Sequence, residues 1–175
     1  MKKIPTLFVR NPDDRRYVLN EVNPGCEWVI AGEGVATRKY DGTCVKLDDT
    51  GTWWARREVK PGKKTPAGFV PEQHDDVTGK TVGWEPIEQS PFVKFFIDDD
   101  DLDPGTYEFI GPKINGNPEG AEAHMLIRHA EADVLDAPRT YNLLRDWLRD
   151  APYEGVVWHH PDGRMVKLKK RDFPA

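Results

Sequence analysis

The sequence contains few cysteines and no long apolar run, and both shortages exclude some classes of protein. Only two of its 175 residues are cysteines, Cys26 and Cys44, a number that suggests neither a disulfide framework nor a zinc site. No apolar stretch approaches the ~18–20 residues of a membrane-spanning helix, and Met1–Pro5 lacks the apolar core of a signal peptide. We therefore expect a soluble, cytoplasmic protein.

Positive charge is also in the minority. The chain has 25 Lys and Arg residues against 30 Asp and Glu residues, and the resulting net charge of −5 argues against indiscriminate coating of nucleic acid. The basic residues nevertheless gather in two clusters, within residues 56–64 and 164–171, and each cluster adjoins a strand with candidate site residues. The acidic run at 98–103 is typical of a solvated loop.

Short strands separated by Gly, Pro and Asp dominate the pattern. The expected strands cover residues 27–31, 35–39, 43–47, 52–56, 106–110, 155–160 and 165–168, with turns at 48–51, 114–118 and 161–163. Residues 60–91 have few periodic apolar positions, so we expect an irregular, mobile loop over a site. Apolar residues on one face predict a helix over residues 138–150. Together these elements predict a single α+β domain over residues 1–175, made mainly of antiparallel sheet with flanking helices.

Lys39-Tyr40-Asp41-Gly42-Thr43 offers an amine nucleophile at a turn that glycine permits. A protonated amine does not attack, so an enzyme that uses Lys39 must favour its neutral form by desolvation or by neighbouring cations. The same residues are also typical of a strand, a turn at Asp41-Gly42 and a second strand. Both interpretations can be true at once, so the other motifs of the chain must show whether Lys39 also has a catalytic role.

Charged residues on later strands suit a nucleotide. Glu108 and Glu154 lie in or next to apolar strands, where a carboxylate needs a wet face or a partner, and either could hold ribose hydroxyls or hydrated Mg2+. Lys167 and Lys169 alternate with apolar residues and so share one sheet face. That alternation is also typical of an edge strand guarded by lysines. If the face lines a cleft instead, both ammonium groups would neutralise a triphosphate and favour the neutral amine of Lys39.

Arg56 follows the aromatic strand Trp53-Trp54-Ala55, with Arg57 beside it. An arginine fork matches phosphate oxygens in a bidentate manner, which makes Arg56 a candidate phosphate ligand. A surface arginine of a hairpin is the alternative.

In this order the motifs resemble those of a known superfamily. Lys39-Tyr40-Asp41-Gly42, Glu108, Glu154-Gly155-Val156-Val157 and Lys167-Leu168-Lys169 resemble nucleotidyltransferase motifs I, III, IV and V of ATP-dependent ligases and capping enzymes. Three longer segments are similar to the small RNA ligase family that includes the vertebrate 5′-to-3′ RNA ligase and its bacterial or phage relatives: Trp54–Arg56 with Lys60-Pro61, Tyr107–Gly111 with Ile114–Pro118, and Glu154–His159. The resemblance covers residues 27–172 and implies the adenylation-domain fold of DNA ligases, which is ATP-grasp-like.

Two features favour RNA ends over DNA ends within this superfamily. Thr43-Cys44 follows Gly42 where DNA ligases and capping enzymes usually continue with an arginine two places after the glycine, and a small hydroxyl residue there is more similar to RNA ligases. The sequence also stops soon after Lys169, so we expect no C-terminal OB-fold.

The resemblance implies an ATP-dependent RNA ligase that joins 5′-phosphate and 3′-hydroxyl RNA ends, as in RNA repair, through a lysyl-AMP intermediate with Mg2+ or Mn2+. It assigns catalysis to Lys39, Lys167 and Lys169, and metal binding to Glu154 and Glu108. The nucleotide would contact these lysines and Arg38, Asp41, Arg56, Glu108, His124 and Glu154, while RNA phosphates would contact Arg57 and Lys60.

Some assignments leave alternatives open. His124 is the candidate for stacking on adenine, although a packed or solvent-facing histidine is equally consistent, and Asp41 also shapes its turn. The alternative functions are a DNA ligase, a GTP-dependent capping-type nucleotidyltransferase, and a non-catalytic module that binds nucleotide or RNA.

Overall fold

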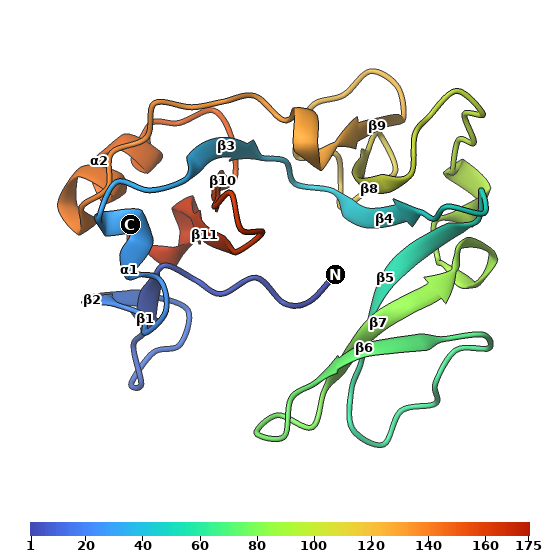
Figure 1. The fold of residues 1–175 in the computed structure, drawn as a ribbon, viewed down its shortest axis with the longest axis horizontal. Helices are drawn as coiled ribbons and strands as arrows, with labels where there is room; N and C mark the ends of the chain where they lie inside the picture. Colours follow the sequence, from blue (N-terminus) through green and yellow to red (C-terminus); the bar gives the residue numbers. More distant parts are fainter. The chain divides into compact units, whose positions relative to one another are not determined.

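The computed structural model describes all of residues 1–175, which divide into two compact units (Figure 1). Unit 1 consists of Met1–Lys3 and Asp41–Glu131, and unit 2 of Ile4–Tyr40 and Ala132–Ala175. Antiparallel sheets dominate and helices are few, which confirms the expected mainly antiparallel architecture. The single-domain organisation and the nucleotidyltransferase fold stay predictions. None of the helices has the length and apolarity needed to cross a bilayer.

Unit 2 is built on a three-stranded antiparallel sheet. The central strand β10 (Gly155–His159) pairs with β11 (Met165–Lys169) on one side and with β3 (Val35–Lys39) on the other. The expected hairpin at 155–168 and the strand at 35–39 are therefore confirmed. Around the sheet lie a two-stranded ribbon, β1 (Phe8–Arg10) with β2 (Val18–Val22), the helices α1 (Glu27–Ile30) and α2 (Tyr141–Arg149), and the 3-10 turn η4 (Lys170–Asp172).

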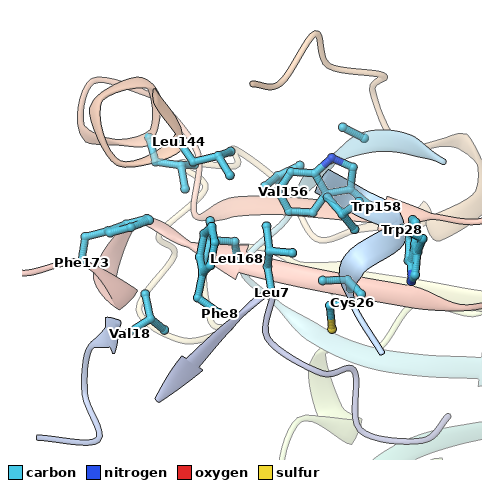
Figure 2. Close-up of a cluster of buried hydrophobic side chains, with 14 of the residues drawn as sticks. Leu7, Phe8, Val18, Cys26, Trp28, Leu144, Val156, Trp158, Leu168 and Phe173 are labelled. Carbon is cyan, nitrogen blue, oxygen red and sulfur yellow. The ribbon is translucent and has the colours of Figure 1, made fainter. Parts of the chain in front are cut away.

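One face of this sheet is committed to a hydrophobic core. Val156 and Trp158 of β10 and Leu168 of β11 are fully buried there. Figure 2 shows them in one cluster with Leu144 of α2 and with side chains of the N-terminal segment, Leu7 and Phe8. Because strand residues alternate between faces, the neighbours of these core residues must point to the opposite face.

Both outer strands of the three-stranded sheet are covered along their edges. On β11, the Lys167 N–H donates to the Pro5 carbonyl and the Lys167 carbonyl accepts from the Leu7 N–H, both at 2.9 Å. On β3, the Arg38 N–H donates to the Asp133 carbonyl at 2.8 Å. β11 is thus an edge strand of this sheet, as one interpretation of the lysine alternation predicted, but its outer edge is covered at Lys167.

Unit 1 contains a six-stranded antiparallel sheet with the strand order β6-β7-β5-β4-β8-β9. The strands are β4 (Thr43–Leu47), β5 (Trp53–Val59), β6 (Val70–His74), β7 (Thr81–Pro86), β8 (Gly105–Ile110) and β9 (Met125–Arg128), with the 3-10 turns η1 (Ile87–Gln89), η2 (Val93–Phe95) and η3 (His129–Glu131). Val45, Trp53 and Phe109 are buried in the core on one face of this sheet. Residues such as Lys46, Arg56 and Glu108 lie on the opposite face by strand alternation.

Two predicted elements are wrong. Residues 27–31 were expected to form a strand, but Glu27–Ile30 is a short helix whose Trp28 and Val29 enter the core of unit 2. So short an apolar run gives no periodicity that separates helix from strand. The irregular loop expected over 60–91 instead contains β6 and β7, and Val82 and Trp84 of β7 are buried.

The strands predicted on either side of Asp41-Gly42 are present as β3 and β4, but the two do not form a hairpin, because they belong to different sheets. Gly42 does not have the positive φ expected of such a turn. A Cβ at Gly42 would instead lie 2.3 Å from the Phe109 carbonyl oxygen and 2.7 Å from the Ile110 side chain. Glycine is therefore required by the close approach of β8, and not by a left-handed backbone.

Candidate active site

Two lysines and one glutamate meet on the polar face of the unit 2 sheet. The Lys39 Nζ lies 2.8 Å from Oε2 of Glu154, and the Lys169 Nζ lies 3.0 Å from Oε1 of the same carboxylate. The side chain of Lys39 is 20% exposed, that of Glu154 12% and that of Lys169 16%. The structure thus joins three residues that are distant in sequence into one partly buried cluster.

Strand register explains this convergence. Gly155 of the central strand lies opposite Lys39 on one side and opposite Lys169 on the other, and Glu154 directly precedes it. A Cβ at Gly155 would lie 2.2 Å from the Leu168 carbonyl oxygen, so the close pairing of β10 with β11 excludes a side chain here. Two residues along, Val157 lies opposite Lys167, which places Lys167 on the same face as Lys39 and Lys169.

Opposing effects act on the pKa of Glu154. Burial alone would raise this pKa, but the nearby ammonium groups of Lys39 and Lys169 outweigh it, so the pKa lies below its ordinary value. Glu154 is therefore a carboxylate at neutral pH. Lys39, Lys167 and Lys169 lie on the same face, and three cationic side chains gathered there suit a phosphate group.

The backbone of Lys169 is fixed by a buried acid. Asp172, whose side chain is 3% exposed, accepts the Lys169 N–H on Oδ2 at 2.8 Å and forms an ion pair through Oδ1 with Arg10 at 2.8 Å. The last residue of β11 is thus held by a partner in η4, and Lys169 is presented to Glu154 from a rigid strand end.

In unit 1, Glu108 has a partner that the sequence did not reveal. Its Oε2 lies 2.8 Å from Nε2 of His129 in η3, while Nδ1 of the same ring lies 2.9 Å from the Thr106 hydroxyl. The sequence indicated that Glu108 needs a wet face or a partner, but nothing in it pointed to a histidine 21 residues downstream.

Other predicted site residues of unit 1 have their own contacts. The Asp41 N–H donates to Oε1 of Glu119 at 2.7 Å. Nε of Arg56, on the face of its sheet opposite the core, lies 3.5 Å from the Met1 carbonyl. Arg57 and Lys60 are exposed to solvent, so the structure leaves both accessible to a polyanion.

His124 is packed against aromatic rings. It stacks on Phe95 and Phe109 with ring centroids 5.5 and 5.6 Å apart, and a Cβ at Gly111 would lie 2.3 Å from its Cδ2. The packed alternative for this histidine is thus what the structure shows. Its stacking on adenine stays a prediction.

Arg38 does not share the face of Lys39. It lies opposite the buried Val156, and its guanidinium lies over the Tyr40 ring at 4.4 Å from the ring centroid. Any contact of Arg38 with a nucleotide would therefore be made from the other side of β3, and its nucleotide-binding role stays a prediction.

Glu154 offers a divalent cation one ionised carboxylate in this cluster. Over residues 1–175, no three or more His, Cys, Asp or Glu side chains gather in a group that could hold a metal. Glu154 is nevertheless in the charged form that a cation binds. One carboxylate fits hydrated Mg2+, which is usually held through one or two carboxylates with waters and substrate phosphates.

Comparison with known proteins agrees with this chemistry. Residues 92–174 match the family model described as RNA ligase 1. Over these residues the chain is similar to the RNA ligase 1 family. RNA ligase 1 of Pongo abelii is 34% identical over 79 residues, which cover 40% of this chain and 24% of that protein. RNA ligase 1 of Rattus norvegicus is 25% identical over 214 residues, which cover 78% of this chain and 66% of that protein.

The chain thus spans less than two thirds of the length of these RNA ligase 1 proteins. The segment that matches the RNA ligase 1 family includes Glu108, Glu154, Lys167 and Lys169. The candidate nucleophile Lys39 precedes it, and its contact with Glu154 connects it to the matched segment.

Proposed function

We propose that this protein is an ATP-dependent RNA ligase whose nucleophile is Lys39. The observation that carries the proposal is the bridge in which Glu154 contacts both Lys39 and Lys169. It gathers on one sheet face the nucleophile and the cations that the motif resemblance assigns to adenylylation. The similarity to proteins named RNA ligase 1 supports RNA as the substrate.

The first step transfers AMP to the protein. The neutral amine of Lys39 attacks the α-phosphorus of ATP, a P–N bond forms, and the bond to the β-phosphate oxygen breaks. Pyrophosphate leaves, and the amine proton passes to water. Lys169 and Lys167 stabilise the negative charge on the transferring phosphoryl group, because both project from the face that carries Lys39.

The next two steps join RNA ends. An oxygen of the RNA 5′-phosphate attacks the phosphorus of lysyl-AMP, which releases Lys39 and forms a 5′-5′ pyrophosphate. A 3′-hydroxyl then attacks the RNA phosphate, AMP leaves, and a phosphodiester forms. Lys167 and Lys169 serve these steps in the same manner, since each step moves charge through a phosphoryl group.

The remaining residues bind substrate or metal. Glu108 binds the ribose or contributes to the metal shell, and Arg38, Asp41, Arg56 and His124 contact the nucleotide. Arg57 and Lys60, which are exposed, contact RNA phosphates. Glu154 holds Mg2+ or Mn2+, which when bound neutralises phosphate charge.

A joining assay tests this function. With ATP and Mg2+, the protein should seal RNA with a 5′-phosphate and a 3′-hydroxyl, and comparing single-stranded, nicked-duplex and hairpin-loop RNA with DNA equivalents identifies the substrate. Lys39→Ala should abolish joining from ATP but retain joining of RNA that is already 5′-adenylylated, because the last step does not use the lysine. Joining from ATP by Lys39→Ala, or efficient joining of DNA alone, would contradict the proposal.

A further inference from the structure

His129 of unit 1 bridges two polar residues of one strand. Thr106 and Glu108 lie two positions apart on β8, so their side chains point to the same face. The turn η3 follows β9 directly and brings the His129 imidazole over both of them. Nε2 lies 2.8 Å from Oε2 of Glu108 and Nδ1 lies 2.9 Å from the Thr106 hydroxyl.

The partners define which ring nitrogen carries the proton. An ionised carboxylate only accepts hydrogen bonds, so Nε2 must donate to Glu108. In the neutral ring Nδ1 is then an acceptor, and the Thr106 hydroxyl donates to it. The threonine therefore fixes the orientation of the ring, and the ring fixes one carboxylate oxygen of Glu108.

The bridge is partly shielded from water. The side chains of Glu108 and His129 are 13% and 26% exposed, so the contact is stronger and more directional than one on an open surface. With Oε2 committed to His129, the other oxygen, Oε1, is the one that can accept a hydroxyl of a sugar. A carboxylate held in one orientation loses less freedom when a ligand binds.

We propose that His129 is a positioning residue that orients the Glu108 carboxylate to accept a hydrogen bond from a ribose hydroxyl of ATP. This inference rests on the proposed function and adds a specificity device to it. His129 acts through Glu108 alone, so its loss weakens nucleotide binding and leaves the chemical step at Lys39 unaltered.

The experiment measures formation of the protein–AMP adduct under single-turnover conditions over a range of ATP concentrations. His129→Ala should raise the half-saturating ATP concentration about tenfold, in line with a hydrogen bond to a charged group, with little change in the maximal rate. The same assay with 2′-deoxy-ATP and 3′-deoxy-ATP identifies the hydroxyl. The deoxy analogue that lacks it should bind the unmodified protein less well and should show no further weakening in His129→Ala.

Two conservative variants separate positioning from folding. The amide nitrogen of His129→Gln can replace Nε2 and should restore most of the ATP affinity, whereas the shorter His129→Asn can replace only Nδ1 and should behave as His129→Ala. His74→Ala is a matched control, because His74 of unit 1 also bonds a threonine, Thr81 at 2.8 Å, but is 54% exposed. It should leave the ATP dependence unaltered.

The outcomes distinguish this inference from the proposed function. If the unmodified protein forms no adduct, the proposed function fails. If the adduct forms but His129→Ala keeps the ATP dependence of the unmodified protein, the positioning role is wrong. An equal loss with ATP and with both deoxy analogues would also overturn it, since a purely structural histidine would not distinguish between them.

Discussion

The Lys39 ammonium lies 2.8 Å from a carboxylate oxygen of Glu154, although 115 residues separate the two in the sequence. The antiparallel pairing of β3 with β10 produces this contact, because Gly155 lies directly opposite Lys39. Glu154 also contacts Lys169, so one carboxylate organises two cations. The arrangement of the proposed site is thus a direct consequence of strand register.

Replacing Glu154 by Gln should destabilise the protein at pH 7. Lys39 and Lys169 would lose their shared carboxylate, and we expect a loss of about 1–3 kcal/mol in the free energy of unfolding. The pKa of Glu154 lies below its ordinary value of 4.5, so its contribution is complete above that pH and is lost as the pH falls through the folded-state pKa. Denaturant unfolding at several pH values should show the variant and the unmodified protein converging below pH 4.5. A difference that persists or grows in acid would contradict this.

Replacing Glu85 by Gln should instead stabilise the protein at pH 7. Glu85 is only 2% exposed, and burial raises its pKa despite the opposing charge of Arg57. A raised pKa means that stability falls as the pH rises through it, so the variant should be more stable at pH 7, by up to about 1 kcal/mol. The gain should vanish below pH 4.5, where Glu85 is protonated in both folded and unfolded states. Thermal unfolding at both pH values measures it, and a less stable variant at pH 7 would show that the carboxylate has a favourable partner.

Removing the Asp172 carboxylate should destabilise the protein. Asp172→Ala leaves Arg10 without its buried counter-ion and the Lys169 N–H without its acceptor, so we expect a loss of about 3 kcal/mol. Asp14→Ala, which removes the partner of the exposed Arg16, is the control and should leave the melting temperature unaltered. Calorimetry of both variants provides the comparison. An Asp172 variant as stable as the Asp14 variant would refute the anchoring role.

Gly42 should tolerate no side chain. Gly42→Ala and Gly42→Asn should each cost about 1–3 kcal/mol, because a Cβ would lie 2.3 Å from the Phe109 carbonyl oxygen. Gly51 is the informative contrast: its φ is +83° and a Cβ added there would have nothing within 4 Å, so Gly51→Asn should be tolerated. Denaturant unfolding of the three variants measures the difference. Equal tolerance of asparagine at both positions would mean that Gly42 serves only a turn.

Strand periodicity predicted the part of the site that depends on alternation. It placed Lys167 and Lys169 on one face of a strand and the hairpin partner at 155–160, and the structure confirms both. The motif order predicted that Lys39 and Glu154 act together, and their contact agrees with it. The register that makes them meet at Gly155 depends on pairing between distant strands, which no local pattern specifies.

The sequence patterns failed to predict features that depend on contacts between segments distant in the sequence. Glu27–Ile30 is helical because Trp28 and Val29 enter a core assembled from remote segments. Gly42 follows a strand and resembles a turn residue, yet its requirement is the close approach of β8. His129 lacked any local signal, since its role arises only when η3 returns over Thr106 and Glu108.

Transfer of AMP to Lys39 is the most direct test of the account. The protein would be incubated with Mg2+ and ATP labelled at the α-phosphate, and the modified residue mapped by peptide mass spectrometry. Arg171→Met, which removes an exposed cation beside β11, is the charge-matched control for Lys169→Met. We predict a covalent phosphoramidate adduct on Lys39, stable in alkali and labile in acid, that is absent in Lys39→Ala, strongly reduced in Lys169→Met and unchanged in Arg171→Met. No adduct with ATP, an adduct only with GTP, or an adduct on another residue would contradict the account.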